Sequence, residues 1–268
     1  NDEEKTKQLK KLVTPFILRR NKKEVLTELP DKIEQNIILP FNDEEEKLYV
    51  ANLAEANKEL QELYDLEGSD KMQILKLLTR LRQLCLEPRL VYDDIDQPSS
   101  KLKACMELIK TMQENKQKVL LFSSFTSVLD LIAEECQKAG ITYYMLTGST
   151  NKEDRRELVS RFQKDDTTVF LISLKAGGTG LNLTSAEAVI HFDPWWNVSA
   201  QNQATDRAYR IGQKNNVQVF NLVMKDSVEE KIIELQKRKK ELADMFVENN
   251  SGGLSQMSKE DILSLFTV

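Results

Sequence analysis

The sequence predicts an α/β protein built on a parallel sheet with helices on both faces. Two observations carry this prediction. Short runs of continuous apolar residues recur after residue 100, and strands that are buried on both faces have this character. Segments with helical periodicity alternate with these runs, as connections between parallel strands require. The strands are expected at 118–123, 143–147, 167–173, 187–193 and 217–223.

Residues 1–41 are interpreted as a linker that leads into this unit and starts it. The chain opens in a charged stretch, NDEEKTKQLKKL, which suggests a piece of a longer protein. Residues 42–98 are expected to form a helical hairpin. Asn42 is a suitable N-cap because acidic residues fill the turn that follows it. The second helix of the hairpin stops before Pro88, and a polar stretch with a proline follows it.

Residues 99–225 are expected to hold the sheet, with helices at 100–116, 127–140, 151–164 and 203–213. Residues 226–268 form the last predicted unit. A long helix over 227–248 leaves the sheet, and a glycine-containing linker leads from it to a short helix capped at Ser258. The apolar runs are too short to span a bilayer, which argues against a membrane protein.

Three loops are expected on one edge of the sheet, because ligands of open parallel sheets bind beyond the carboxyl ends of the strands. They follow the strands 118–123, 143–147 and 167–173. The third loop contains Gly177, Gly178 and Gly180. Glycines in such a place let backbone N–H groups approach an anion, commonly a phosphate. A glycine-rich turn alone is weak evidence for that role.

The stretch QATDRAYRIGQ at 203–213 places Arg207 and Arg210 about one turn apart on a predicted helix, which Gly212 would end. The pair is either a solvated surface, with Arg207 in a salt bridge to Asp206, or a clamp for an anion. Aligned guanidiniums stabilise charge on a transferring phosphoryl group. None of the nine glycines precedes a lysine, so the Walker loop that holds ATP phosphates is absent, and no Walker B pattern follows a strand. The phosphate would therefore come from a partner.

Several segments resemble the second motor lobe of the Swi/Snf-type chromatin-remodelling ATPases of helicase superfamily two. The resemblance covers nearly the whole chain. RNA helicases of the same superfamily usually carry Gly-Arg-x-Gly-Arg in place of DRAYRIGQ. The resembling segments are PFILRRNKKEVLTELPDK (15–32), VLLFSSF (119–125), YYMLTGSTNKEDRRELVSRF (143–162), SLKAGGTGLNLTSAEAVIHFDPWWN (173–197), QATDRAYRIGQ (203–213) and SVEEKIIELQKRKKELADMF (227–246).

The resemblance implies a RecA-like lobe of the P-loop NTPase type, with the helical hairpin inserted and the last long helix bracing it. Arg207 and Arg210 would be catalytic arginine fingers. They would reach ATP held by a first lobe that is absent from this chain. The residues implied in ATP binding are Gln203, Gly178, Gly180, Asn182 and Asp206, and those implied in DNA binding are Ser123, Ser124, Phe125, Gly148, Ser149, Thr150, Ser173, Lys175 and Trp196.

The resemblance also implies cofactors and partners. ATP and Mg²⁺ would be bound mainly by the first lobe, and none would bind tightly to this chain, which we expect to be inactive alone. The partners would be double-stranded DNA and the first RecA-like lobe, in a monomeric protein. The compact C-terminus favours a prokaryotic relative, cytoplasmic at the nucleoid, and a eukaryotic one would be nuclear. Two alternatives stay open: the second lobe of an RNA helicase, and a non-catalytic nucleotide- or DNA-binding module.

Other residues of chemical interest have simpler interpretations. Cys85, Cys105 and Cys136 lie in apolar helical patterns and are expected to be buried free thiols. The only histidine, His191, is expected to be a hydrogen-bonded strand residue rather than a catalyst. Trp195 and Trp196 are either core aromatics, or one of them reaches the DNA groove or its backbone. Asp193, at the end of a predicted strand, is hypothesised to orient Arg207 or Arg210.

Overall fold

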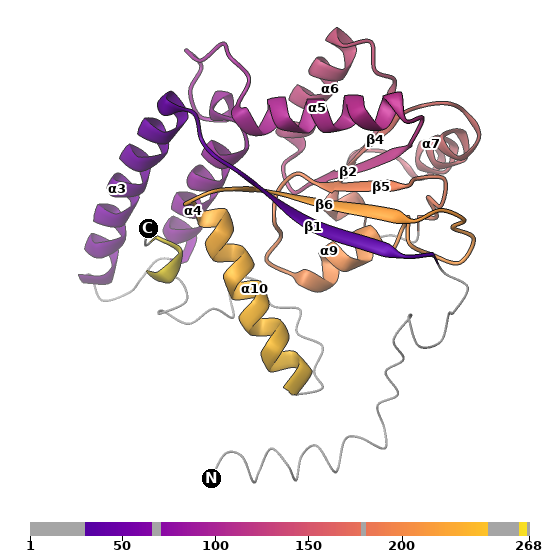
Figure 1. The fold of residues 1–268 in the computed structure, drawn as a ribbon. Helices are drawn as coiled ribbons and strands as arrows, with labels where there is room; N and C mark the ends of the chain where they lie inside the picture. Colours follow the sequence, from indigo (N-terminus) through magenta and orange to yellow (C-terminus); the bar gives the residue numbers. More distant parts are fainter. Residues whose placement is uncertain (1–29, 66–70, 178–180, 246–262, 267–268) are drawn as a thin grey trace.

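A computed structural model describes residues 30–65, 71–177, 181–245 and 263–266. Its centre is a six-stranded, all-parallel sheet with the strand order β1-β6-β5-β2-β4-β3 (Figure 1). The five strands predicted from the sequence are confirmed. The strands are β1 (Lys32–Leu39), β2 (Val119–Ser123), β3 (Tyr143–Leu146), β4 (Val169–Ser173), β5 (Ala188–His191) and β6 (Val217–Met224).

Strand β1 was not predicted, and its position explains why. It is an edge strand that pairs only with β6, over eight residues. Most of its side chains are exposed, so it lacks the apolar run that marks the central strands. Only Ile37 and Leu39 pack against the core. The mixed polar and apolar sequence of β1, KIEQNIIL, therefore gave only a weak strand signal.

Helices cover both faces of the sheet, and the side chains of successive residues in each central strand point to opposite faces. In β2, Val119 and Leu121 pack with α5 and α6 on one side. Leu120 and Phe122 pack on the other side, with α7 and α9. Each fully buried side chain of this size contributes about 1.5–3 kcal/mol. The covering helices are α5 (Ser100–Glu114), α6 (Thr126–Lys138), α7 (Lys152–Lys164), the short α8 (Leu174–Gly177) and α9 (Val198–Thr205).

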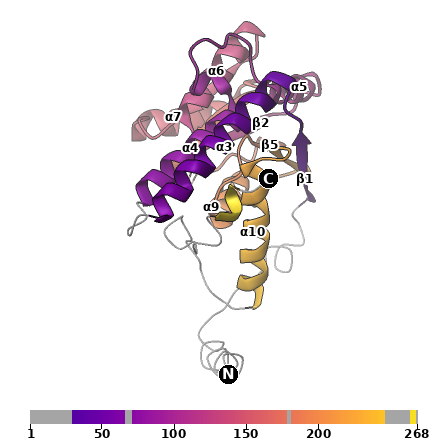
Figure 2. The same cartoon turned by 90° about the vertical axis from the view of Figure 1, so that its left-hand side faces the viewer.

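The predicted helical hairpin consists of α3 (Asp43–Asp65) and α4 (Lys71–Leu86), followed by the short η2 (Pro88–Leu90). It lies beyond the carboxyl ends of the strands, next to α10 (Val228–Met245) (Figures 1 and 2). The predicted N-cap is confirmed, because Asn42 Oδ1 accepts hydrogen bonds from the N–H groups of Glu44 and Glu45 at 3.0 and 2.9 Å. Glu45 Oε1 in turn accepts from the Ser100 N–H at 2.7 Å, which joins the start of α3 to the start of α5.

A third apolar cluster holds the hairpin to α10. Most of its members come from α3, α4 and α10, including Leu60, Leu78 and Ile232, and they are joined by Met224 of β6 and by Leu265 and Phe266. The Tyr49 hydroxyl accepts a hydrogen bond from the Val228 N–H at 2.7 Å, which fixes α3 against the first turn of α10. The expected cap at Ser258 lies outside the described residues. The boundaries proposed above between the linker, hairpin, sheet and last unit stay predictions.

The buried thiols expected from the sequence are present. Cys85, Cys105 and Cys136 are free and buried. Burial raises the pKa of each thiol, that of Cys136 to about 12, which keeps all three protonated and unreactive. Among the residues that the structure describes, no helix is long and apolar enough to cross a membrane.

A buried ion pair joins α5, β6 and α10. Lys101 Nζ donates to both carboxylate oxygens of Glu229 at 2.6 and 2.7 Å, and the two side chains are 0% and 1% exposed. Glu229 Oε2 also accepts from the Met224 N–H at 2.8 Å. The ammonium lies 5.4 Å from the centre of the Phe192 ring. Burial raises the pKa of Glu229, while Lys101 opposes that shift by favouring the carboxylate.

We predict that Lys101→Met lowers the free energy of unfolding by about 3–5 kcal/mol, because it leaves the Glu229 carboxylate buried without a counter-charge. The double variant Lys101→Met/Glu229→Gln should recover most of this loss, since it removes both charges and retains an acceptor for Met224. Lys103→Met, at an exposed position of the same helix, is the control. Urea denaturation measures all three, and a double variant no more stable than Lys101→Met would contradict the prediction.

Candidate functional site

The two arginines lie in turns rather than on the predicted helix. Helix α9 spans Val198–Thr205, with Asn197 as its N-cap and Asp206 as its C-cap. The expected helix over 203–213 is therefore wrong over most of its length. The Arg210 N–H bonds to the carbonyl of Ala208, two residues before it, which is not a helical pattern. Gly212, expected to end the helix, instead has a φ of +103° within these turns.

The segment 206–213, called here the arginine turn, is held by contacts that local sequence does not reveal. Ala208 and Tyr209 are buried in the apolar cluster under α9. The Leu183 N–H donates to the Arg207 carbonyl at 3.0 Å. The side chain of Gln213 is buried and donates to the Ala186 carbonyl at 2.8 Å. The arginine turn is thereby fixed to the segment that leads into β5.

The two guanidiniums of the arginine turn repel each other. Burial lowers the pKa of Arg207, and the charge of Arg210 lowers it further, while Asp206 opposes both effects. Arg207 is partly buried and Arg210 is exposed. An anion that bound between them would relieve the repulsion, and the planar fork of a guanidinium can donate to two oxygens of a phosphoryl group at once.

The arginine turn lies at the amino-terminal edge of the sheet. Helix α9 returns from the carboxyl end of β5 to the start of β6, which runs parallel to β5. The residues expected to bind ATP lie on α9 or close to the segment that follows it. Gln203 is exposed on α9, Asp206 caps it, and Asn182 is exposed in the segment beside Arg207. Gly178 and Gly180 lie outside the described residues.

The three loops expected to contact DNA lie at the opposite, carboxyl edge. Strands β2, β4 and β3 are neighbours, about 4.8 Å apart, so the loops that follow them form a row. Gly148, Ser149 and Lys175 are exposed in this row, and Phe125 is partly exposed. The turn that follows β5 and contains Trp196 extends the row, because β5 lies next to β2.

Two of the expected DNA contacts are buried instead. Ser123 is 0% exposed, and its hydroxyl donates to Asp193 Oδ1 at 2.8 Å. Ser173 is 4% exposed. Both are the last residues of central strands, and both side chains are buried. Their direct contact with phosphate stays a prediction, although this structure buries both side chains.

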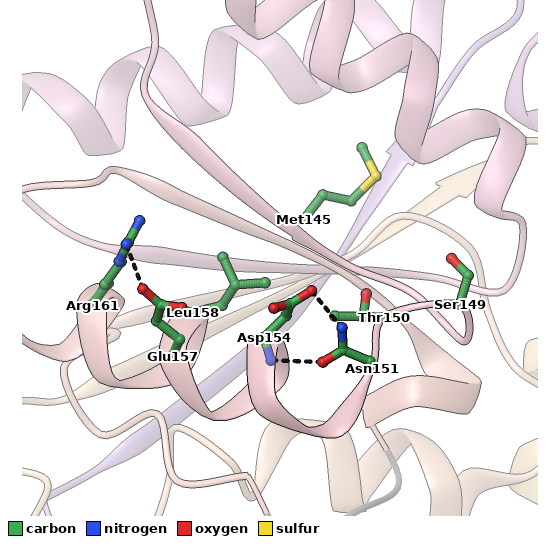
Figure 3. A pocket seen from close by; sticks show the side chains of 8 residues that line it. All are labelled: Met145, Ser149, Thr150, Asn151, Asp154, Glu157, Leu158 and Arg161. Carbon is green, nitrogen blue, oxygen red and sulfur yellow. Dashed lines mark hydrogen bonds and ion pairs between the residues drawn. The ribbon is translucent and has the colours of Figure 1, made fainter.

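The exposed end of the row contains a shallow hollow of about 360 Å³ (Figure 3). Ser149 and Thr150 line it, together with the first turns of α7. Asn151 caps α7 by accepting from the N–H groups of Glu153 and Asp154. Thr150 Oγ1 accepts from the Thr147 N–H at 3.1 Å, so this loop is folded back on itself.

Asp193 contacts neither arginine of the arginine turn. Its carboxylate accepts from Arg82 Nη2 at 2.8 Å and from the Ser124 N–H at 3.0 Å, and it also bonds to the Ser124 hydroxyl. The hypothesis that Asp193 orients Arg207 or Arg210 is therefore wrong, because Asp193 lies at the carboxyl edge. Sequence reasoning missed Arg82. One signal was available, since Arg82 lies on the apolar stripe of α4, four residues after Leu78 and three before Cys85.

His191 is hydrogen-bonded inside the sheet, as expected. Its Nε2 lies 2.9 Å from Thr205 Oγ1, at the last residue of α9, and its ring stacks on Phe122. Burial lowers the pKa of His191 to about 4, although Glu34 and Asp193 favour the charged form. The imidazole is therefore neutral at pH 7. Within the described part of the chain, no cluster of three or more His, Cys, Asp or Glu side chains could hold a metal ion.

Comparison with known proteins identifies the family. Residues 1–90 match the SNF2-related domain, and residues 100–212 match the helicase conserved C-terminal domain. The chain belongs to the SNF2-related family. Both matches agree with the resemblance of its motifs to the second lobe of Swi/Snf-type proteins.

Relatives of this SNF2-related lobe come from several kingdoms. It is 38% identical over 270 residues to an uncharacterized ATP-dependent helicase of Mycoplasma pneumoniae, which covers 99% of the chain and 26% of the relative. It is 35% identical over 284 residues to an ISWI chromatin-remodeling complex ATPase of Saccharomyces cerevisiae, which covers 97% of the chain and 24% of the relative. The chain thus spans about a quarter of the length of these curated relatives.

A solved structure shares the fold of the SNF2-related lobe. It is the Sulfolobus solfataricus SWI2/SNF2 ATPase core in complex with double-stranded DNA. The TM-score is 0.72 and the sequence identity is 32%, over 97% of this chain and 55% of that one. The lobe accordingly has the α/β RecA-like architecture expected from its sequence.

We predict that His191 makes this lobe less stable as the pH falls below about 6.5. The unfolded chain binds a proton there with an ordinary pKa, whereas the folded chain resists protonation until about pH 4. The stability present above pH 6.5 is lost on the way down to pH 4, by about 3 kcal/mol in total. His191→Gln retains a hydrogen-bond donor for Thr205 but cannot be protonated. In this variant the free energy of unfolding should therefore fall less between pH 6.5 and 5.

Two measurements check this prediction. Urea denaturation across the pH range gives the stability, and NMR titration of the only imidazole in the chain gives its pKa directly. An imidazole that titrates near 6.5 in the folded chain would contradict it.

Proposed function

We propose that this chain is the second motor lobe of an ATP-dependent translocase on double-stranded DNA. In the intact protein, ATP and Mg²⁺ bind mainly to a first RecA-like lobe. The second lobe, which is this chain, then closes against the first and brings Arg207 and Arg210 to the γ-phosphate as arginine fingers. Closure moves the loops at the carboxyl edge along the DNA backbone, and product release resets them. The intact protein is an ATP hydrolase, and this chain alone is inactive.

The arginine turn is the observation that carries the proposal. Two guanidiniums lie close enough for one to lower the pKa of the other, and buried contacts fix the backbone beneath them. A structure of this kind holds two like charges close together on a fixed backbone. Preorganised charge of this sort stabilises a transition state without reorganisation during the reaction. The similarity to ATP-dependent helicases supports ATP as the source of the anion.

The carboxyl edge supports the DNA half of the proposal. The row of loops offers exposed glycine, serine and lysine residues, and such groups contact phosphates without reading sequence. A related ATPase core binds double-stranded DNA, which favours duplex DNA over RNA as the track. We propose that the intact protein is a monomer. Its place would be at the nucleoid in a prokaryotic cell, or in the nucleus of a eukaryotic one.

We predict that Arg210→Ala in the full-length protein lowers DNA-stimulated ATP turnover by about 10³–10⁵-fold, the usual effect of losing an arginine finger. ATP affinity should change little, because the first lobe holds most of the nucleotide. Lys214→Ala, at a nearby exposed position, should retain activity. Steady-state hydrolysis and nucleotide-binding titrations give both quantities. Wild-type turnover in Arg210→Ala would contradict the assignment of Arg210 as an arginine finger.

We further predict that duplex DNA, rather than RNA, stimulates the full-length protein, and that this chain alone hydrolyses no ATP and binds it poorly. The measurement is ATP hydrolysis by both proteins with each nucleic acid at a fixed salt concentration, because phosphate contacts depend on salt. Stimulation by RNA alone would indicate an RNA helicase lobe. Tight binding of ATP by the isolated chain would indicate a self-contained nucleotide-binding module.

A further inference from the structure

A buried arginine of the hairpin reaches the loops at the carboxyl edge of the sheet. Arg82 is 7% exposed, on α4. A single terminal nitrogen, Nη2, donates to Asp193 Oδ2 and to Ser124 Oγ, both at 2.8 Å. Asp193 follows β5, and Ser124 follows β2. The arginine therefore bonds to the ends of two neighbouring strands from a helix outside the sheet.

Three aromatic rings surround the same guanidinium. Its central carbon lies 4.9 Å from the centre of the Phe125 ring, 5.8 Å from that of Trp195 and 5.6 Å from that of Trp196. Phe125 is the N-cap residue of α6 and has no side-chain cap bond, and the two tryptophans precede α9. The guanidinium thus contacts side chains from both loops that follow β2 and β5.

The arrangement is costly for the fold, which argues for a role beyond stability. The Nε of Arg82 is buried and has no hydrogen-bond acceptor among the described residues. Its partner Asp193 is 1% exposed. A buried ion pair is often no more stabilising than well-packed apolar side chains, and an unmade hydrogen bond adds a penalty. What an apolar residue could not supply is one planar group that fixes a carboxylate, a hydroxyl and three ring faces together.

We propose that Arg82 is a positioning residue that orders the two loops after β2 and β5 for contact with the DNA backbone, and so makes their geometry depend on the hairpin. The proposal rests on the proposed function, because it assigns these loops to DNA. Arg82 itself is covered by the rings and acts through Ser124, Phe125 and the tryptophan pair. A shift of α4 relative to the sheet would move these groups together.

The experiment compares Arg82→Lys with wild type. Lysine keeps the charge near Asp193 but cannot reproduce the planar contact with the three rings. A second variant, Arg82→Met/Asp193→Asn, removes both charges and keeps the interior neutral, so it remains informative if the lysine variant folds poorly. Arg80→Gln is the control, because Arg80 lies on the same helix with a side chain that is 45% exposed.

The first measurement is independent of activity. Trp195 and Trp196 are the only tryptophans of this chain, so their fluorescence reports on the loop after β5 alone. We expect acrylamide to quench both Arg82 variants about twofold more effectively than wild type, since the guanidinium no longer covers the ring faces. The control should be quenched like wild type. Variants that unfold at lower temperature yet are quenched like wild type would show a purely structural role and overturn the proposal.

The second measurement uses the full-length protein. We expect the DNA concentration for half-maximal stimulation of ATP hydrolysis to rise by about tenfold in the variants, which corresponds to about 1.4 kcal/mol of lost binding. The KM for ATP and the turnover at saturating DNA should stay near wild type. An unchanged DNA requirement would overturn the proposal. Absence of DNA stimulation in the wild-type protein would instead defeat the proposed function, and the quenching result would still decide whether Arg82 orders the loops.

Discussion

The buried ion pair between Lys101 and Glu229 is the interaction on which the arrangement of the whole lobe depends. It connects the first helix of the sheet domain to the helix that follows the last strand, beside the hairpin. Each charge alone would be costly to bury, so the fold tolerates them only when α5, β6 and α10 meet in one geometry. The same ammonium lies over Phe192, which directly precedes Asp193. The ion pair and the Arg82–Asp193 contact therefore meet at the end of β5.

The central part of the fold could be predicted from the sequence because its signals are local. Each central strand is a short apolar run, and burial on both faces is what makes it so. Asn42 and the acids after it marked the start of α3 in the same local way. Strand β1 was missed because an edge strand can mix polar and apolar residues without a continuous apolar run. The position at which α9 ends was not predicted, because the buried contacts of Tyr209 and Gln213 stop the helix. These contacts join segments that are distant in the sequence. The partner of Asp193 could not be known either, since Arg82 is 111 residues away in the chain.

The candidate site is divided between opposite edges of the sheet, and α9 connects them. Its first turn follows the tryptophan pair at the carboxyl edge, and its last residue precedes the arginine turn. Eight residues of helix span about 12 Å, roughly the depth of the sheet. The helix is bonded to the sheet through Gln201 to Asn221 of β6 and through Thr205 to His191 of β5, two residues that are paired between these strands. Movement at one edge is therefore shared with the other through a short, stiff element rather than through a loop.

The parallel pairing of β1 with β6 has a mechanical consequence. Residues before Lys32 enter β1 at the amino-terminal edge, whereas β6 leaves the sheet at the opposite edge and continues into α10. Tension between the entering segment and α10 would pull the two strands in opposite directions along their length. The ladder between them would then be loaded in shear, with all of its hydrogen bonds resisting at once, rather than opened one bond at a time. A lobe that is pulled at the start of β1 and at α10 should therefore resist separation of these two strands. It should transmit the force as a rigid unit.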